Sequence, residues 1–289
     1  MLRQERKYNT IIFEITMIIS LIQPQIWDLD IEKNLNNLTN IVKDLSNSVD
    51  WVIFPEMFLT GFDFSVFKQG DYASFAKESQ IKSLDFLRKL AKEKSCAAEG
   101  SMVCSMEDVA CSIDEKFLNR HYFITKENEW YYDKQKLFSL SEEAKYLNRG
   151  DKSTVAEFKD WKINLKTCYD VRFPEICRNK YSTLNFDYDI MTFVASWPQS
   201  RSKQWKTLLQ ARAIENMCYV IGVNRQGVDS SNNLYSGDSC IINCKGEFLQ
   251  ELNQKDIKGC KENEFIHYYN IDKEDLNRQR QKFPVYLDW

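Results

Sequence analysis

The spacing of apolar residues along the chain switches between a helical period and short apolar runs. From Ile31 to Leu45 the apolar positions are 31, 35, 38, 41, 42 and 45, which would give a helix with one buried face. The run at 51–54 (WVIF) is typical of a buried strand. Further helices are predicted over 84–90 and 201–216, and further strands over 97–104, 118–124, 130–133, 161–165, 188–194 and 218–223. Strands and helices that alternate in this way indicate an α/β fold.

The length and organisation of the chain favour a single domain. A chain of 289 residues can bury a large core, and it contains no internal repeat, low-complexity tract or linker rich in Pro, Gly and Ser. The apolar segment 11–22 is too short to span a bilayer, which takes about 20 residues. No cleavage site of the Ala-x-Ala type follows this segment, so we expect no signal peptide.

Charge and cysteine content exclude several classes of function. The net charge of -3 argues against binding to nucleic acid or to an anionic membrane. The nine cysteines are scattered through a long chain, which favours a reducing compartment, and we expect a cytoplasmic protein. Cys240 and Cys244 have no second Cys pair or His close behind them, so no metal is predicted. No nucleotide-binding glycine motif occurs, and we expect no cofactor.

Cys168 is the best candidate for a catalytic residue. It directly follows the predicted strand 161–165 and precedes Pro174, an arrangement that suggests a nucleophile presented at a strand end. A thiol needs a base before it can attack a carbonyl carbon, and the chain has only two histidines, His121 and His267. A carboxylate therefore has to be considered as the base. Glu56 and Lys134 both follow predicted strands and could converge with the cysteine.

These three residues lie in motifs that resemble those of the nitrilase superfamily of carbon-nitrogen hydrolases. The motifs are 55–62 (PEMFLTGF), 132–134 (YDK) and 168–175 (CYDVRFPE), with 78 residues from Glu56 to Lys134 and 34 from Lys134 to Cys168. The likeness continues through 195–198 (ASWP), 211–216 (ARAIEN), 222–227 (GVNRQG) and 235–239 (YSGDS). With the ending 282–284 (KFP), the chain is most similar to the bacterial omega-amidase branch, which hydrolyses the terminal amide of 2-oxo acid amides such as 2-oxoglutaramate.

The resemblance implies a fold and a catalytic apparatus. The fold would be a four-layer αββα sandwich formed by residues 17–289, with residues 1–16 as an N-terminal extension. Glu56 would be the general base, Cys168 the nucleophile and Lys134 the cation that stabilises the oxyanion. A second glutamate beside the lysine is also implied, and Glu143 matches it better than the neighbouring Glu142. Relatives assemble through their sandwich faces, so a homodimer is expected.

Four further residues are candidates for contacts with the substrate. The N–H of Tyr169 directly follows the nucleophile and could bind the oxyanion. Arg201 follows the predicted strand 188–194, so we expect it at the same edge of the sheet as Cys168, which also follows a strand. Its guanidinium is suited to binding a carboxylate. Trp197 or Phe62 would form an apolar wall. The simpler interpretation of Arg201 is that it opens the next helix in solvent.

Simpler roles and rival functions remain open. Cys168 taken alone could be a buried structural thiol, Lys136 a surface residue and His121 a packed strand residue. An N-carbamoyl amine hydrolase or an aliphatic amidase would share the same three catalytic residues. A catalytically silent interaction protein with the same fold is a further hypothesis, and loss of a catalytic residue would be its signature. All three residues are present.

Overall fold

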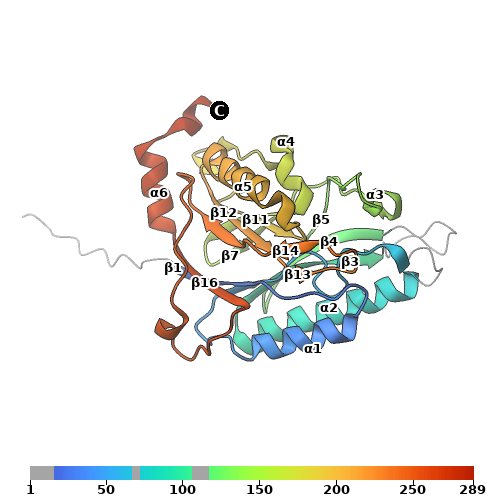
Figure 1. The fold of residues 1–289 in the computed structure, drawn as a ribbon. Coiled ribbons are helices and arrows are strands. Elements are labelled where there is room, and N and C mark those ends of the chain that lie inside the picture. Colours follow the sequence, from blue (N-terminus) through green and yellow to red (C-terminus); the bar gives the residue numbers. More distant parts are fainter. Residues whose placement is uncertain (1–15, 67–71, 106–116) are drawn as a thin grey trace, which may run out of the picture.

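The computed structural model describes residues 16–66, 72–105 and 117–289. Two β-sheets are stacked face to face, and helices cover their outer faces (Figure 1). The larger sheet has the strand order β16-β1-β2-β3-β4-β5, with β6 beside β4. Its strands are β1 (Thr16–Ile22), β2 (Trp51–Ile53), β3 (Ala97–Ser105), β4 (Phe117–Ile124), β5 (Glu129–Asp133), β6 (Leu147–Asn148) and β16 (Ile266–Asp272).

The second sheet has the strand order β15-β12-β11-β8-β7. Its strands are β7 (Val155–Phe158), β8 (Trp161–Thr167), β11 (Ile190–Ala195), β12 (Tyr219–Asn224) and β15 (Cys240–Ile242). Two short hairpins lie outside the main sheets, and they are formed by β9 (Tyr181–Ser182) with β10 (Asn185–Phe186) and by β13 (Gln226–Val228) with β14 (Leu234–Ser236).

The helices complete four layers. α1 (Ile31–Val42) and α2 (Tyr72–Lys94) pack on the larger sheet, whereas α4 (Pro174–Cys177) and α5 (Ser202–Asn216) lie on the second sheet (Figure 1). α3 (Glu143–Tyr146) is a single turn, and α6 (Lys273–Lys282) lies near the C-terminus. The α/β fold and the four-layer αββα sandwich expected from the sequence are therefore confirmed.

Side-chain alternation along the strands produces the layers. On β8, Ile163 and Leu165 face the larger sheet and pack with Ile19 and Ile53 between the sheets. The apolar positions predicted for α1 face the other side of the larger sheet, where Leu38 is fully buried. Asp30 caps this helix by accepting a hydrogen bond from the Lys33 N–H at 3.0 Å.

The predicted elements agree with the structure except in their extents. The helix predicted over 84–90 lies in the C-terminal half of α2, and the one predicted over 201–216 is α5, in which Ile214 is 49% exposed. No helix in the described parts of the chain is long and apolar enough to cross a membrane.

Strand polarity places several loops at one end of the sandwich. β2, β3 and β5 run in one direction in the larger sheet, and β8, β11 and β12 are parallel to one another in the second. The loops that follow β2, β5 and β11 meet, because Glu56 from the first of them contacts Lys134 and Ser196 from the other two. Cys168, which follows β8, lines one pocket with Lys134 and Ser196. Ligand sites of α/β proteins form at such carboxyl ends.

Candidate active site

Lys134 lies at the centre of a buried polar cluster. Its Nζ donates to Glu56 Oε1 at 2.8 Å and to both carboxylate oxygens of Glu143, at 2.8 and 3.0 Å. All three side chains are fully buried. The positive charge of Lys134 is thus compensated by two neighbouring carboxyl groups. If both glutamates are ionised, the cluster has a net charge of one negative unit.

The same arrangement keeps Lys134 cationic. Burial by itself would lower the lysine pKa, but the charges of Glu143 and Glu56 outweigh burial and raise the pKa above its usual value. For Glu143, burial raises the carboxyl pKa against the opposing influence of Lys134. An ammonium kept in its charged form at this position can stabilise negative charge that develops beside it.

Glu56 is oriented by groups from both sheets. Asn119 on β4 donates its Nδ2 to Glu56 Oε1 at 2.8 Å and also reaches Glu143 Oε1 at 3.3 Å. The main-chain N–H of Ser196, after β11, donates to Glu56 Oε2 at 2.9 Å. The carboxylate is therefore held on both oxygens, and its rotation is restricted.

Cys168 begins a turn of 3-10 helix over Cys168–Arg172, directly after β8. Its φ of +46° is in the left-handed region, which is unfavourable for a residue with a Cβ. The turn is stabilised by the Asp170 carboxylate, whose Oδ2 accepts the Thr167 N–H at 2.9 Å. Such backbone strain at Cys168 is typical of functional sites, where it fixes the direction of a reactive side chain.

The thiol of Cys168 is buried against the acidic side of the cluster. Burial raises its pKa well above the usual value, the negative charge of Glu56 raises it further, and Lys134 acts in the opposite direction. The resting thiol is therefore protonated near neutral pH. Formation of the nucleophilic thiolate requires a base, and Glu56 is the neighbouring carboxylate that can accept the proton.

Glu142 and Glu143 differ sharply in their surroundings. Glu143 is fully buried against Lys134, and its Oε2 also accepts the Phe138 N–H at 2.7 Å. The side chain of Glu142 is 33% exposed and lies 3.3 Å from the Lys145 ammonium. Of the two alternatives left open by the sequence, the structure brings Glu143 into the cluster.

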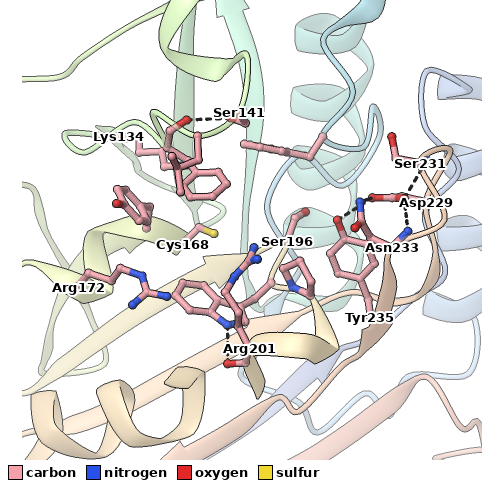
Figure 2. A pocket seen from close by; sticks show the side chains of 16 residues that line it. Lys134, Ser141, Cys168, Arg172, Ser196, Arg201, Asp229, Ser231, Asn233 and Tyr235 are labelled. Carbon is pink, nitrogen blue, oxygen red and sulfur yellow. Dashed lines mark hydrogen bonds between the residues drawn. The ribbon is translucent and has the colours of Figure 1, made fainter. Parts of the chain in front are cut away.

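A pocket of about 440 Å³ opens over Cys168 and Lys134 (Figure 2). All four residues expected to contact the substrate line it, and these are Phe62, Tyr169, Trp197 and Arg201. The Phe62 ring centre lies 5.3 Å from Lys134 Nζ. Figure 2 shows the Arg201 side chain extending into the pocket on the side of Cys168, while its main-chain oxygen accepts the Trp197 indole N–H at 2.9 Å.

The charges around this pocket are uneven. Arg172 and Arg201 both line it, and among the described residues no carboxylate forms an ion pair with either of them. Asp229 also lines it, but its Oδ1 accepts the N–H groups of Ser231 and Asn233, and its Oδ2 accepts the Tyr235 hydroxyl at 2.9 Å. The Asp229 carboxylate is thus committed to its own loop. Arg172 donates Nη2 to Gln204 Oε1 at 2.6 Å and lies over the Trp197 ring, so Arg201 is the guanidinium that remains available to an anion.

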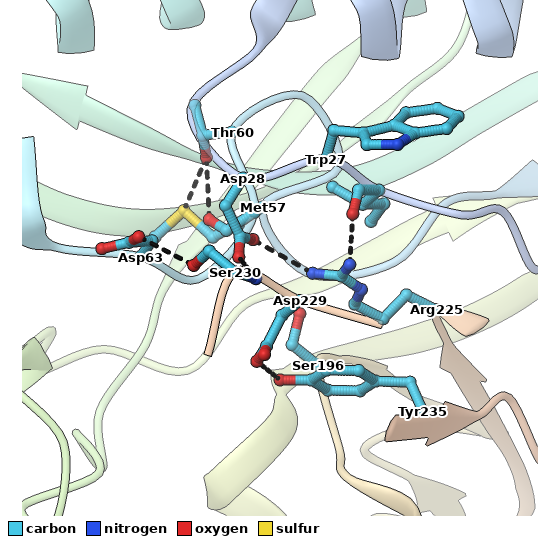
Figure 3. A network of polar contacts seen from close by, with 12 residues as sticks. Trp27, Asp28, Met57, Thr60, Asp63, Ser196, Arg225, Asp229, Ser230 and Tyr235 are labelled. Carbon is cyan, nitrogen blue, oxygen red and sulfur yellow. Dashed lines mark hydrogen bonds and ion pairs between the residues drawn. The ribbon is translucent and has the colours of Figure 1, made fainter. Parts of the chain in front are cut away.

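A buried ion pair supports the far wall of the pocket. Arg225 is fully buried and pairs with Asp28 at 3.2 Å, and Asp28 also accepts the Ser230 N–H at 2.8 Å (Figure 3). Ser230 in turn donates its hydroxyl to Asp63 at 2.9 Å. These contacts attach the loop between β13 and β14 to the segments around Asp28 and Asp63.

Two sequence candidates lie away from this chemistry. Lys136 extends toward solvent and pairs with Glu175 at 2.9 Å. His121 is buried on β4, where its Nε2 lies 2.7 Å from Glu99. Within the described residues, no group of three or more His, Cys, Asp or Glu side chains is placed to hold a metal ion.

Sequence reasoning missed two residues that hold the glutamates. Asn119 lies in an ordinary strand sequence. The one hint in that sequence is that a polar residue occupies a position between Phe117 and His121, which lie on the same face of the strand and are both buried. Ser196 acts through its main-chain N–H, which any residue except proline would provide, so its side chain gives no signal.

Known proteins match this chain over most of its length. The family described as carbon-nitrogen hydrolase matches residues 18–281. The chain belongs to this family. It is therefore an enzyme of the carbon-nitrogen hydrolase class, as the motifs around Glu56, Lys134 and Cys168 led us to expect.

Individual relatives cover nearly the whole chain. Omega-amidase YafV of Yersinia enterocolitica is 31% identical over 94% of this chain and 96% of its own length. The 2-oxoglutaramate amidase of Bacillus subtilis is 30% identical over 89% of this chain and 91% of its own. A carbon-nitrogen hydrolase superfamily protein of Xanthomonas campestris, solved with an arsenic adduct in its active site, is 32% identical, covers 95% of this chain and 97% of its own, and superimposes with a TM-score of 0.79.

Proposed function

We propose that this carbon-nitrogen hydrolase is an amidase that releases ammonia from the terminal amide of a small 2-oxo acid amide, such as 2-oxoglutaramate or 2-oxosuccinamate. The observation that carries the proposal is the position of Arg201 in the same pocket as Cys168, without a carboxylate partner among the described residues. A guanidinium in that position suits the carboxylate at the other end of such a substrate. The names of the relatives from Yersinia enterocolitica and Bacillus subtilis support the same substrate class.

The first half of the proposed reaction forms a thioester. Glu56 takes the proton of the Cys168 thiol, and the sulfur attacks the amide carbon to give a tetrahedral oxyanion. Lys134 and the main-chain N–H of Tyr169 stabilise that oxyanion. When the C–N bond breaks, the proton held by Glu56 passes to the nitrogen and ammonia leaves.

The second half returns the enzyme to its starting state. Water attacks the thioester carbon while Glu56 takes one of its protons, and collapse of the second oxyanion breaks the C–S bond. The proton then returns to the Cys168 sulfur, and the product is a dicarboxylic 2-oxo acid. In this scheme Glu143 keeps Lys134 in position and remains bound to it throughout.

The apolar part of the pocket would bind the short carbon chain of the substrate. Trp197 and Phe62 would flank the methylene groups between the amide and the 2-oxo acid end. Their rings offer no partner for a second charge along that chain. An N-carbamoyl amine hydrolase or an aliphatic amidase would use the same Glu56, Lys134 and Cys168, so the choice of acyl group is the point to test.

A panel of amides separates these functions. Ammonia release should be measured in parallel from 2-oxoglutaramate, 2-oxosuccinamate, glutamine, asparagine and an N-carbamoyl amino acid. We expect the highest kcat/KM with one of the two 2-oxo acid amides. Faster turnover of the N-carbamoyl compound would contradict the proposal, and the absence of any turnover would favour a silent protein. The expected homodimer is tested separately by light scattering after size exclusion.

A further inference from the structure

Lys166 on β8 is a buried cation that the proposed reaction does not use. Its side chain is fully buried, and its Nζ has no hydrogen-bond partner within the part of the chain that the structure describes. The ammonium lies 4.2 Å from the ring centre of Tyr132, which provides a cation–π contact. A buried ammonium without hydrogen bonds is costly, so its position calls for a compensating charge.

Asp170 and Lys166 both contact Tyr132, because the Tyr132 hydroxyl donates to Asp170 Oδ2 at 2.8 Å and the Tyr132 ring lies beside Lys166 Nζ. Asp170 is fully buried, two residues after Cys168, and burial raises its pKa while Lys166 has the largest opposing influence. In the same way, burial lowers the Lys166 pKa and Asp170 is the main group that opposes this shift. Lys166 and Asp170 form no direct hydrogen bond, so their charges act on each other across the Tyr132 side chain that both of them contact.

The hydrogen bonds to Asp170 indicate that its carboxyl group is ionised. Its Oδ2 accepts the Thr167 N–H at 2.9 Å and the Tyr132 hydroxyl at 2.8 Å, and its Oδ1 accepts the Lys136 N–H at 2.9 Å. Three donors directed at two oxygens suit a carboxylate, which only accepts hydrogen bonds. A neutral acid would have to direct its own proton at one of these donors.

These contacts join the two catalytic loops. Thr167 directly precedes Cys168, and Lys136 is two residues after Lys134. The Tyr132 hydroxyl that donates to Asp170 also accepts the Gln135 N–H, at 3.3 Å. One buried carboxylate thus ties the turn of the nucleophile in one sheet to the loop of the lysine in the other.

We propose that Lys166 is a positioning residue for the proposed reaction: its ammonium holds Asp170 as a carboxylate, and that carboxylate fixes the separation of Cys168 and Lys134. Lys166 touches neither the pocket nor the substrate, and it acts through Asp170. The inference rests on the proposed role of Cys168 as the nucleophile. It adds a residue that the catalytic motifs do not include.

The test compares Lys166→Met with Lys162→Met. Methionine keeps the length of the side chain and removes its charge, and Lys162 lies on the same strand, where its Nζ instead donates to the Phe186 main-chain oxygen. We expect Lys166→Met to lower kcat by about tenfold to a hundredfold with little change in KM, because small displacements of reacting groups have effects of this size. Lys162→Met should retain the kcat of the unchanged protein.

A second readout does not depend on the substrate. The rate at which iodoacetamide alkylates Cys168, followed by mass spectrometry of its peptide, should fall with Lys166→Met and stay unchanged with Lys162→Met. If no amide is turned over by the unchanged protein, the proposed function fails, while the alkylation rates still test the position of Cys168. Equal kcat and equal alkylation rates in both variants, at temperatures where both are folded, would overturn the inference.

Two more variants separate positioning from folding. Tyr132→Phe removes one hydroxyl donor to Asp170 and should lower kcat in the same direction without removing a charge. Asp170→Asn combined with Lys166→Met should lose no more activity than Asp170→Asn alone, because both changes act on one link. A double variant that shows the full product of the two single losses would place Lys166 outside this link.

Discussion

The main-chain N–H of Ser196 donates to Glu56 Oε2 at 2.9 Å, although the two residues are 140 positions apart in the sequence. Glu56 follows a strand of the larger sheet, and Ser196 follows a strand of the second sheet. The contact therefore fixes the general base of the proposed reaction from the sheet that carries the nucleophile. It also explains why both oxygens of a completely buried carboxylate have partners.

Replacement of the nucleophile should stop the reaction. We expect Cys168→Ala to abolish ammonia release, and Cys168→Ser to leave very little, because a hydroxyl is much harder to deprotonate than a thiol. Ammonia release at saturating amide measures both. Rapid quenching and intact mass spectrometry should show an acyl adduct in the unchanged protein and none in Cys168→Ala. A folded Cys168→Ala protein with ordinary activity would refute the mechanism.

Glu56→Gln should have opposite effects on turnover and on thiol reactivity. Burial and the Glu56 charge both raise the pKa of the Cys168 thiol, so removal of that charge should lower the pKa. The rate of alkylation by iodoacetamide rises as pH passes through the thiol pKa, and in Glu56→Gln this rise should occur at lower pH. Turnover should nevertheless fall by orders of magnitude, because the base is lost. An unshifted alkylation profile would indicate that Glu56 does not influence the thiol.

The two adjacent glutamates provide a matched pair of variants. Glu143→Gln removes the charge that contacts Lys134 through two hydrogen bonds, and we expect kcat to fall by about a hundredfold or more. Glu142→Gln makes the same chemical change on a partly exposed side chain and should retain activity. Steady-state kinetics on one amide measures both variants. Equal losses in the two would remove Glu143 from the proposed apparatus.

Arg201 should affect only substrates that carry a carboxylate. Arg201→Ala should lower kcat/KM for 2-oxoglutaramate by about 1.5–3 kcal/mol of transition-state stabilisation, the size of a hydrogen bond to a charged group. A short neutral amide serves as the control and should be turned over as before. Equal losses on the charged and the neutral amide would mean that Arg201 maintains the shape of the pocket instead.

Loss of the buried cation Arg225 should destabilise the fold. Arg225→Met leaves the Asp28 carboxylate buried without its partner, and breaking a buried pair in this way costs about 3–5 kcal/mol. The free energy of unfolding in urea measures this loss. Lys245→Met is the control, because its pair with Glu247 lies at the surface and should contribute little. A loss below about 1 kcal/mol in Arg225→Met would show that Asp28 finds other compensation.

Local patterns in the sequence were sufficient for the elements and for the identity of the chemical groups. The period of apolar residues predicted α1, and a short apolar run predicted β2, because burial of one face or of a whole strand depends on neighbouring positions alone. The motifs around Glu56, Lys134 and Cys168 were recognisable for a similar reason. Each motif is a continuous stretch in which the reactive side chain follows a strand.

Contacts between distant segments were decided only by the tertiary structure. The choice between Glu142 and Glu143 depends on which side chain reaches Lys134, and the direction of a short helical turn cannot be read from two identical neighbours. Asn119 and Ser196 could not be assigned from the sequence, because Glu56, which both of them contact, lies far away along the chain. Lys166 and Asp170 are only four residues apart, but Tyr132, which contacts both, comes from the other sheet. The sequence by itself determined which residues could react. Packing of the two sheets decided which of them meet and which charges hold them there, since burial makes every unpaired charge costly.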